Sequence, residues 1–247
     1  MWSCAVSIDK ELQSEFGFLI AEFRRIKNIS YAVEDGGGRY FIYLAALCEY
    51  GADAEERLRE ILTCLYLNKF KLKYFLGGVK YRKLDFTAVT LISSLVGFDR
   101  EFEEAVCRRA LVDASDYSVD GIYEFRLKQL RENWDELTEL CNNLIAVTDS
   151  DEDIFGMAAF MSSSANSSAR ITVKKGGDGR AALFRDSSHI PLDTEEIFGE
   201  REFDLLHRII LEHPKEVNYE RSAVSREFTE CLKQISFAVP SEEILPL

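Results

Sequence analysis

The stretch that decides the fold is GIYEFRLKQLRENWDELTELCNNLI, residues 121–145. Its apolar side chains recur alternately four and three residues apart, at Tyr123, Leu127, Leu130, Trp134, Leu137, Cys141 and Leu144. This spacing places them on one side of a helix, as in a helix that is packed along its whole length. We therefore predict one continuous helix over 121–145, capped at its N-terminus by Ser118 or Asp120.

The pattern before this helix is also helical, from about residue 53 onward. An earlier set of leucines shares one helical face, and Gly77-Gly78 ends that helix; the set is Leu58, Leu62, Leu65, Leu72 and Leu76. Lys69 falls in the middle of this face, where it indicates either a groove for a partner or a kink that turns the side chain outward. Shorter helices are predicted over 86–95 and 101–111.

The N-terminal segment has the pattern of a small α/β element. We predict a strand over 2–8, a helix over 11–27 and a hairpin of two strands, 29–33 and 40–47. The glycines at 36–38 supply the tight reversal of this hairpin, because glycine accepts a positive φ. No helix pattern or phosphate-loop lysine follows them, which excludes a P-loop.

The C-terminal segment changes period from helical to alternating. A short helix over 154–160 precedes a Ser-rich stretch, 161–169, which is typical of a linker. Beyond it we predict strands over 170–175 and 181–185 extended by 189–192, a helix over 202–212, a strand over 216–219 and a helix over 223–235. The fold class is thus α+β: an N-terminal α/β hairpin element with a helical middle (1–160), a linker (161–169) and a compact C-terminal α/β domain (170–247).

Composition limits the compartment and the class of protein. The 247 residues are 47% hydrophobic and 30% charged with four prolines, which is globular composition. No apolar run approaches the ~18 residues of a membrane span, and the charges at 9–11 interrupt any signal-peptide core. The six cysteines are widely spread, and Cys64, Cys107 and Cys141 fall in apolar helical patterns. We expect buried reduced thiols and a cytoplasmic location.

The charge is unevenly distributed along this acidic chain. The net charge is −13, yet residues 57–83 carry eight basic side chains and one acidic. In the stretch 69–83, Lys69, Lys71, Lys73, Lys80, Arg82 and Lys83 alternate with aromatic residues. Such a stretch could bind single-stranded nucleic acid or anionic lipid headgroups. In an acidic protein, a solvated face that pairs with acidic segments of the same chain is the favoured interpretation.

Catalytic and metal-binding patterns are weak. Asp204 stands three residues before His207 and could orient it, but the sequence has no G-x-S-x-G nucleophile elbow, and we expect every cysteine to be buried. The acidic residues at 149, 151 and 153 resemble the start of a calcium loop. The pattern fails where Ile154 and Phe160 replace the required glycine and glutamate. No cofactor or metal is predicted.

Two segments resemble a known family. SVDGIYEFRLK (118–128) and FDLLHRIILEHPKEV (203–217) resemble the signature stretches of the YtxC-like sporulation proteins. The order of parts is similar over roughly residues 60–235, although Ile122-Tyr123 replaces the usual phenylalanine and the tail lacks a cysteine cluster. Arg126 and Lys128 match the signature. The resemblance implies an association with spore formation and no defined chemistry.

These observations give three functional hypotheses. The leading one is a non-enzymatic protein that acts through protein contacts, with candidate partner-binding residues Lys69, Lys73, Lys80, Arg82, Lys83, Arg126 and Lys128. The alternative is a nucleic-acid-binding module that uses the stretch 69–83. The third is an enzyme whose site assembles from Arg126, Asp204 and His207. The partners and the oligomeric state are not determined by the sequence.

Overall fold

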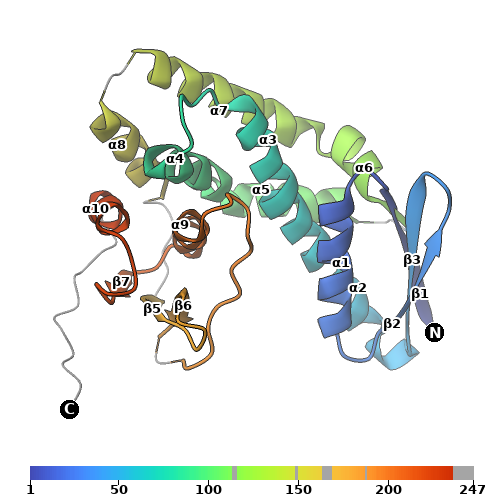
Figure 1. Ribbon diagram of the computed structural model, residues 1–247. Helices are drawn as coiled ribbons and strands as arrows, with labels where there is room; N and C mark the ends of the chain where they lie inside the picture. Colours follow the sequence, from blue (N-terminus) through green and yellow to red (C-terminus); the bar gives the residue numbers. More distant parts are fainter. Residues whose placement is uncertain (113–115, 148–149, 163–168, 187, 236–247) are drawn as a thin grey trace. The chain divides into compact units, whose positions relative to one another are not determined.

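The computed structural model describes residues 1–112, 116–147, 150–162, 169–186 and 188–235 (Figure 1). The chain forms two compact units. Unit 1 comprises Met1–Gly77 and Asp99–Leu137, and unit 2 comprises Gly78–Phe98 and Thr138–Leu247. Each unit combines a sheet with helices, which confirms the predicted α+β class.

The sheet of unit 1 has the strand order β2-β3-β1-β4. Its strands are β1 (Trp2–Asp9), β2 (Ser30–Asp35), β3 (Arg39–Ala46) and β4 (Asp116–Ser118). The central pair is antiparallel, with Val6 opposite Ile42, and both side chains are buried. Helix α1 (Gln13–Arg25) packs on this sheet (Figure 1), where the ring of Phe16 stacks on Tyr40 of β3 with centroids 4.2 Å apart. The predicted strand, helix and hairpin are thus confirmed.

Strand β4 corrects the prediction of helix throughout 53–145. Its three residues pair in parallel with β1, and Tyr117 is buried and donates its hydroxyl to the carbonyl of Leu111. A three-residue strand is too short to show an alternating pattern. Its pairing partner also lies more than a hundred residues earlier in the chain, so no local signal reveals it.

The leucine-rich helix of unit 1 contains a π-helical segment. It runs through η1 (Cys48–Tyr50), α2 (Gly51–Cys64), the π segment η2 (Leu65–Phe70) and α3 (Lys71–Gly78), and it ends at the predicted glycine pair. A π turn holds about one residue more than an α turn, so it rotates the residues that follow it. As a result Lys69 is only half-buried, while Lys71 is completely buried.

The predicted continuous helix over 121–145 is interrupted. It consists of α6 (Val119–Gly121), the π segment η3 (Ile122–Arg126), a bend at Leu127 and α7 (Lys128–Val147). Ser118 is the cap, because its Oγ accepts a hydrogen bond from the Gly121 amide at 3.3 Å. The predicted seam is buried at Leu127, Leu130, Trp134 and Cys141. Helix α5 (Arg100–Ala110) completes unit 1.

Unit 2 is built around a buried helix. Every residue of α4 (Phe86–Gly97) from Ala88 onward is buried. Helix α4 contacts α8 (Asp151–Ser162), α9 (Arg201–Glu212) and α10 (Arg226–Gln234). The sheet of unit 2 has the order β6-β5-β7, with strands β5 (Arg170–Lys175), β6 (Ala181–Arg185) and β7 (Glu216–Tyr219). These elements were all predicted, with shifts of a few residues at their ends.

The predicted strand over 189–192 is wrong. The amide of Leu192 donates to the carbonyl of Leu183 at 2.7 Å, but Pro191 has no amide hydrogen with which to continue a ladder. Residues 163–168 of the predicted linker lie outside the described residues, and Met161 and Ser162 belong to α8. The domain boundary expected there stays a prediction. In the described part of the chain, no helix is both long and apolar enough to span a membrane.

Candidate interaction surface

A buried ion pair lies at the centre of unit 1. Lys71 Nζ is 2.6 Å from Glu103 Oε2, and the indole Nε1 of Trp134 donates to Glu103 Oε1 at 2.7 Å. The three residues come from α3, α5 and α7. Burial lowers the pKa of Lys71 to about 8, and burial raises the pKa of Glu103. The hydrogen bonds hold Trp134 in a defined orientation.

Trp134 supports a cluster of aromatic rings. Its ring centroid lies 5.5 Å from that of Tyr74 and 6.4 Å from that of Tyr123. Tyr123 in turn contacts Phe70, with centroids 4.5 Å apart. Burial raises the pKa of Tyr123 to about 12, so its hydroxyl stays protonated at neutral pH.

Phe70, Tyr74 and Tyr123 of this cluster form one wall of a cavity of about 420 Å³ in unit 1. The cavity is bounded by the end of β1 and the turn after it, by η2 and α3, and by α6 and η3. Its lining residues are Asp9, Glu11, Leu12, Phe70, Lys73, Tyr74, Asp120, Tyr123 and Glu124. We call this the acidic aromatic cavity.

Some of the lining charges are already paired. Arg39 donates to both carboxylate oxygens of Asp120, at 2.6 and 2.8 Å. Glu124 pairs with Arg131 at 3.0 Å, and Lys73 lies 3.7 Å from Glu15. Burial opposes ionisation of Asp120, but the hydrogen bonds from Arg39 and from backbone amides, together with the charge of Arg39, lower the pKa of that carboxyl.

Asp9 and Glu11 carry the remaining negative charge. Asp9 Oδ1 accepts a hydrogen bond from the Glu11 amide at 2.9 Å. Among the described residues, no basic side chain forms an ion pair with either carboxylate. The charged lining residues and their direct ion-pair partners together carry five negative and three positive charges. The net charge around the cavity is therefore −2.

Phe125 projects from the segment that borders the cavity, and its side chain is 84% exposed. The π segment η3 turns Tyr123 into the cavity wall and leaves Phe125 in solvent. Arg126 donates to the carbonyl of Ala110 at 2.9 Å, which fixes this segment to the end of α5. Lys128 pairs with Glu132 along α7. Phe125 was missed, although a phenylalanine off the apolar seam is a signal that the sequence contains.

The basic stretch 69–83 is divided between the units. In unit 1, Lys69 lies over the ring of Phe18 at 5.9 Å, and Lys73 lines the acidic aromatic cavity. Among the aromatic residues of the stretch, Phe75 is completely buried and Phe70 nearly so, as is Tyr66 just before them, whereas Tyr74 and Tyr81 are partly exposed. Lys71 is also buried in its ion pair. Because they are completely buried, Lys71, Tyr66 and Phe75 are not accessible for phosphate pairing or base stacking.

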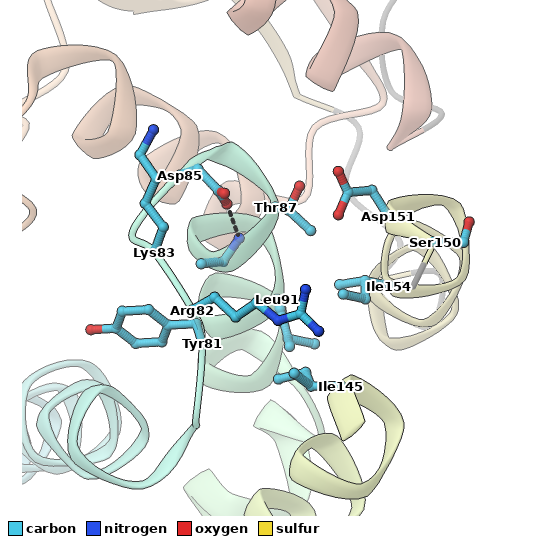
Figure 2. A pocket seen from close by; sticks show the side chains of 11 residues that line it. Tyr81, Arg82, Lys83, Asp85, Thr87, Leu91, Ile145, Ser150, Asp151 and Ile154 are labelled. Atoms are coloured by element: carbon cyan, nitrogen blue, oxygen red, sulfur yellow. Dashed lines mark hydrogen bonds between the residues drawn. The ribbon is translucent and has the colours of Figure 1, made fainter. Parts of the chain in front are cut away.

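The other three basic residues belong to unit 2. Lys80 donates its backbone amide to Asn142 Oδ1 at 2.7 Å. Arg82 and Lys83 line a cavity of about 140 Å³ with Asp85 and Asp151. Figure 2 shows the Arg82 guanidinium group directed toward Ile145 and Ile154, while the Lys83 side chain points away from them. Asp85 caps α4, because its Oδ1 accepts from the Ala88 amide at 3.0 Å (Figure 2).

The carboxylate of Asp204 binds the backbone just before α9. Its Oδ1 accepts hydrogen bonds from the amides of Ile197 and Phe198, both at 2.8 Å. His207 Nδ1 instead lies 2.9 Å from Ser93 Oγ. Arg126 belongs to unit 1, so a catalytic site built from all three residues stays a prediction.

Three of the cysteine expectations need correction. Cys107, Cys141 and Cys231 are buried as expected, but Cys4 and Cys64 are only partly buried and Cys48 is exposed. Burial raises the pKa of Cys107 to about 12 and that of Cys141 to about 11. A hydrogen bond from the N-terminal ammonium group lowers the pKa of Cys48. In the described residues, no group of three or more His, Cys, Asp or Glu side chains is arranged to hold a metal ion.

Comparison with known proteins gave no match. No family model matches the chain, no curated protein matches it, and no solved structure matches it. The proposed function therefore rests on the residues and their geometry.

Proposed function

We propose that this protein is a non-enzymatic interaction protein that binds a protein partner through unit 1. The binding surface consists of Phe125 and the rim of the acidic aromatic cavity. The observation that carries the proposal is the 84% exposure of Phe125 beside that cavity. A protruding aromatic side chain next to a cavity is typical of the centre of a protein interface, where a few aromatic residues supply most of the affinity.

The segment that presents Phe125 is held at several points. Ser118 caps its start, Arg39 binds Asp120, and Arg126 binds the end of α5. A surface that is already ordered loses little conformational entropy when a partner binds, so more of the contact energy appears as affinity. These contacts support an interface that exists before the partner arrives.

The biological setting rests on the family resemblance alone. The segment 118–128, which contains Phe125, is the stretch that resembles the YtxC-like sporulation proteins. We therefore propose spore formation as the process and the cytoplasm as the compartment. The partner in this proposal is another protein.

Affinity capture with matched variants tests the proposal. The tagged protein and its Phe125→Ser variant are used to capture partners from sporulating cells, after nuclease treatment and at both low and high salt. The control is Ile190→Ser, which removes a similarly exposed apolar side chain, 78% exposed, from unit 2. We expect the wild type and Ile190→Ser to capture similar amounts of a protein partner. Phe125→Ser is expected to capture at least tenfold less of it.

Two results would contradict the proposal. One is capture of the same partners by Phe125→Ser as by the wild type. The other is recovery of nucleic acid alone, lost at high salt, which would favour the hypothesis of a nucleic-acid-binding module. Because Phe125 is exposed, its substitution is expected to change stability by no more than about 0.5 kcal/mol, so loss of folding does not confuse the result.

A further inference from the structure

We infer that the acidic aromatic cavity receives a basic side chain, arginine or lysine, of the partner protein. This inference rests on the proposed function and names the chemistry of the group that would enter beside Phe125.

The cavity has suitable size and walls for such a side chain. Its volume of about 420 Å³ exceeds that of one amino-acid side chain and falls within the usual range of ligand pockets, roughly 300–1,000 Å³. The rings of Phe70, Tyr74 and Tyr123 form part of its lining. Aromatic faces attract a cation, and the apolar stem of lysine or arginine packs against rings at the same time.

The charges at the rim select for a cation. Asp120 and Glu124 are already engaged by Arg39 and Arg131. Arg39 also attracts Asp9, but among the described residues no basic side chain lies within ion-pair distance of Asp9 or Glu11. A guanidinium or ammonium group would pair with these two carboxylates. A phosphate or carboxylate would meet repulsion from them, so the cavity disfavours an anionic occupant.

The aromatic wall is fixed before a ligand arrives. Tyr74 and Tyr123 both pack on Trp134, which donates to Glu103 of the buried ion pair. The Tyr74 hydroxyl also donates to Asp135 Oδ1. Rings that are held from behind keep their positions when the cavity is empty, and preorganisation of this kind favours binding.

Substitution of Lys73 distinguishes this inference from the nucleic-acid hypothesis. Its side chain lines the cavity, is 66% exposed and lies 3.7 Å from Glu15. It therefore competes with an incoming cation for the negative rim. Removal of its charge is expected to strengthen binding of a basic group, whereas the nucleic-acid hypothesis expects removal of Lys73 to weaken binding of a polyanion.

The test is a nuclear magnetic resonance titration of the full chain. The probes are N-acetyl-arginine amide and N-acetyl-lysine amide, with the neutral N-acetyl-glutamine amide and the anionic N-acetyl-glutamate amide for comparison. We expect saturable shifts at Tyr74 and Tyr123 with the two cationic probes. We expect affinity at least threefold weaker with the neutral probe, and no binding of the anionic one.

Variants of single charges complete the test. We expect Glu11→Gln to reduce the affinity for the arginine probe two- to fivefold, and Lys73→Gln to increase it by a similar factor. Lys27→Gln and Glu136→Gln, which change exposed charges outside the cavity lining, are expected to leave the affinity unchanged. Equal binding of all four probes, or weaker binding by Lys73→Gln, would overturn the inference.

The result is independent of the proposed function. If Phe125→Ser no longer captures the partner and the cationic probes do not bind, the proposed interaction surface is supported. The inference that the cavity receives a basic side chain is then wrong. If the probes bind and Phe125→Ser still captures the partner, the cavity is a binding site and Phe125 is not part of the interface.

Discussion

Lys71 and Glu103 form an ion pair in the interior of unit 1, with 2.6 Å between Nζ and Oε2 and side-chain exposures of 0% and 4%. The pair joins α3 to α5, and Trp134 joins α7 to the same carboxylate. Burial of two charges has a large desolvation penalty, which their attraction offsets only when both partners are present. The pair thus makes the packing of three helices depend on two residues that are 32 positions apart.

Removal of one partner should destabilise unit 1 strongly. We expect Lys71→Met to reduce the free energy of unfolding by about 3–5 kcal/mol, because it leaves Glu103 buried without its counter-charge. The double variant Lys71→Met/Glu103→Gln keeps an acceptor for Trp134 and is expected to recover most of that loss. Chemical denaturation followed by tryptophan fluorescence measures the effect on unit 1, since both tryptophans, Trp2 and Trp134, belong to it. Additive losses in the double variant would contradict the account.

The same pair predicts a pH dependence in the alkaline range. Burial lowers the pKa of Lys71 from 10.5 to about 8. Between these values the unfolded chain holds this proton and the folded chain has largely released it, so stability rises with pH. We expect the unfolding free energy of the wild type to increase from pH 8 to 10.5 relative to the double variant, which lacks both groups. A constant or falling difference would show that folding does not lower the pKa of Lys71.

Periodicity predicted most elements of the fold, but not the details that form the cavity. The helices α1, α4, α5, α9 and α10 follow from apolar spacing, since each buries one face or more. The π segments η2 and η3 have no counterpart in that spacing, because one extra residue in a turn changes which side chains face inward. Lys71 therefore moved into the core and Lys69 moved out of its centre, contrary to the simple helical pattern.

The candidate site depends on contacts between distant parts of the chain. Asp9, Phe70 and Tyr123 reach one cavity only because β1, η2 and η3 pack together. No spacing rule relates positions so far apart. Lys73 and Arg126 are candidate partner-binding residues from the sequence, but their charges gave no indication that Lys73 would face an acidic rim.

The Arg39–Asp120 pair predicts a loss of stability in acid. Burial opposes ionisation of Asp120, yet the hydrogen bonds and charge of Arg39, together with backbone hydrogen bonds, lower the pKa of the carboxyl below its usual 3.8. A lowered carboxyl pKa adds stability above pH 3.8, and this stability disappears as the pH falls through the folded-state pKa. We expect Asp120→Asn to reduce the unfolding free energy of unit 1 by about 1–2 kcal/mol at pH 7. The difference from the wild type should shrink below pH 3.8, and a difference independent of pH would argue against the pair.

Asp204 is predicted to be structural in unit 2. Its carboxylate is 2% exposed and accepts from two backbone amides. Asp204→Ala would leave these amides without their partner, at a loss of about 1–3 kcal/mol for each buried group left unsatisfied. Hydrogen exchange at Ile197 and Phe198 should accelerate, while the control Asp178→Ala, at an exposed hairpin turn, should leave it unchanged. Unchanged exchange in Asp204→Ala would refute the assignment.

Thiol reactivity should distinguish Cys48 from the other cysteines. Cys48 is exposed, and the neighbouring ammonium group lowers its pKa, whereas burial raises the pKa of Cys4 and Cys107 to about 12. Because the thiolate is the reactive form, we expect iodoacetamide to modify Cys48 first at pH 7 in the folded protein. Mass spectrometry of the digested protein locates the label, and Cys48→Ser should abolish the fast phase. Fast labelling of Cys107 would mean that the core of unit 1 opens readily.

The central claim is that unit 1 binds a protein partner through Phe125 and the acidic aromatic cavity. Hydrogen exchange of the chain, with and without the captured partner, tests it most directly. The account predicts slower exchange in residues 9–12 and 119–126 when the partner is bound, with unit 2 unchanged. Protection confined to unit 2, or found in unit 1 only away from these two segments, would contradict it.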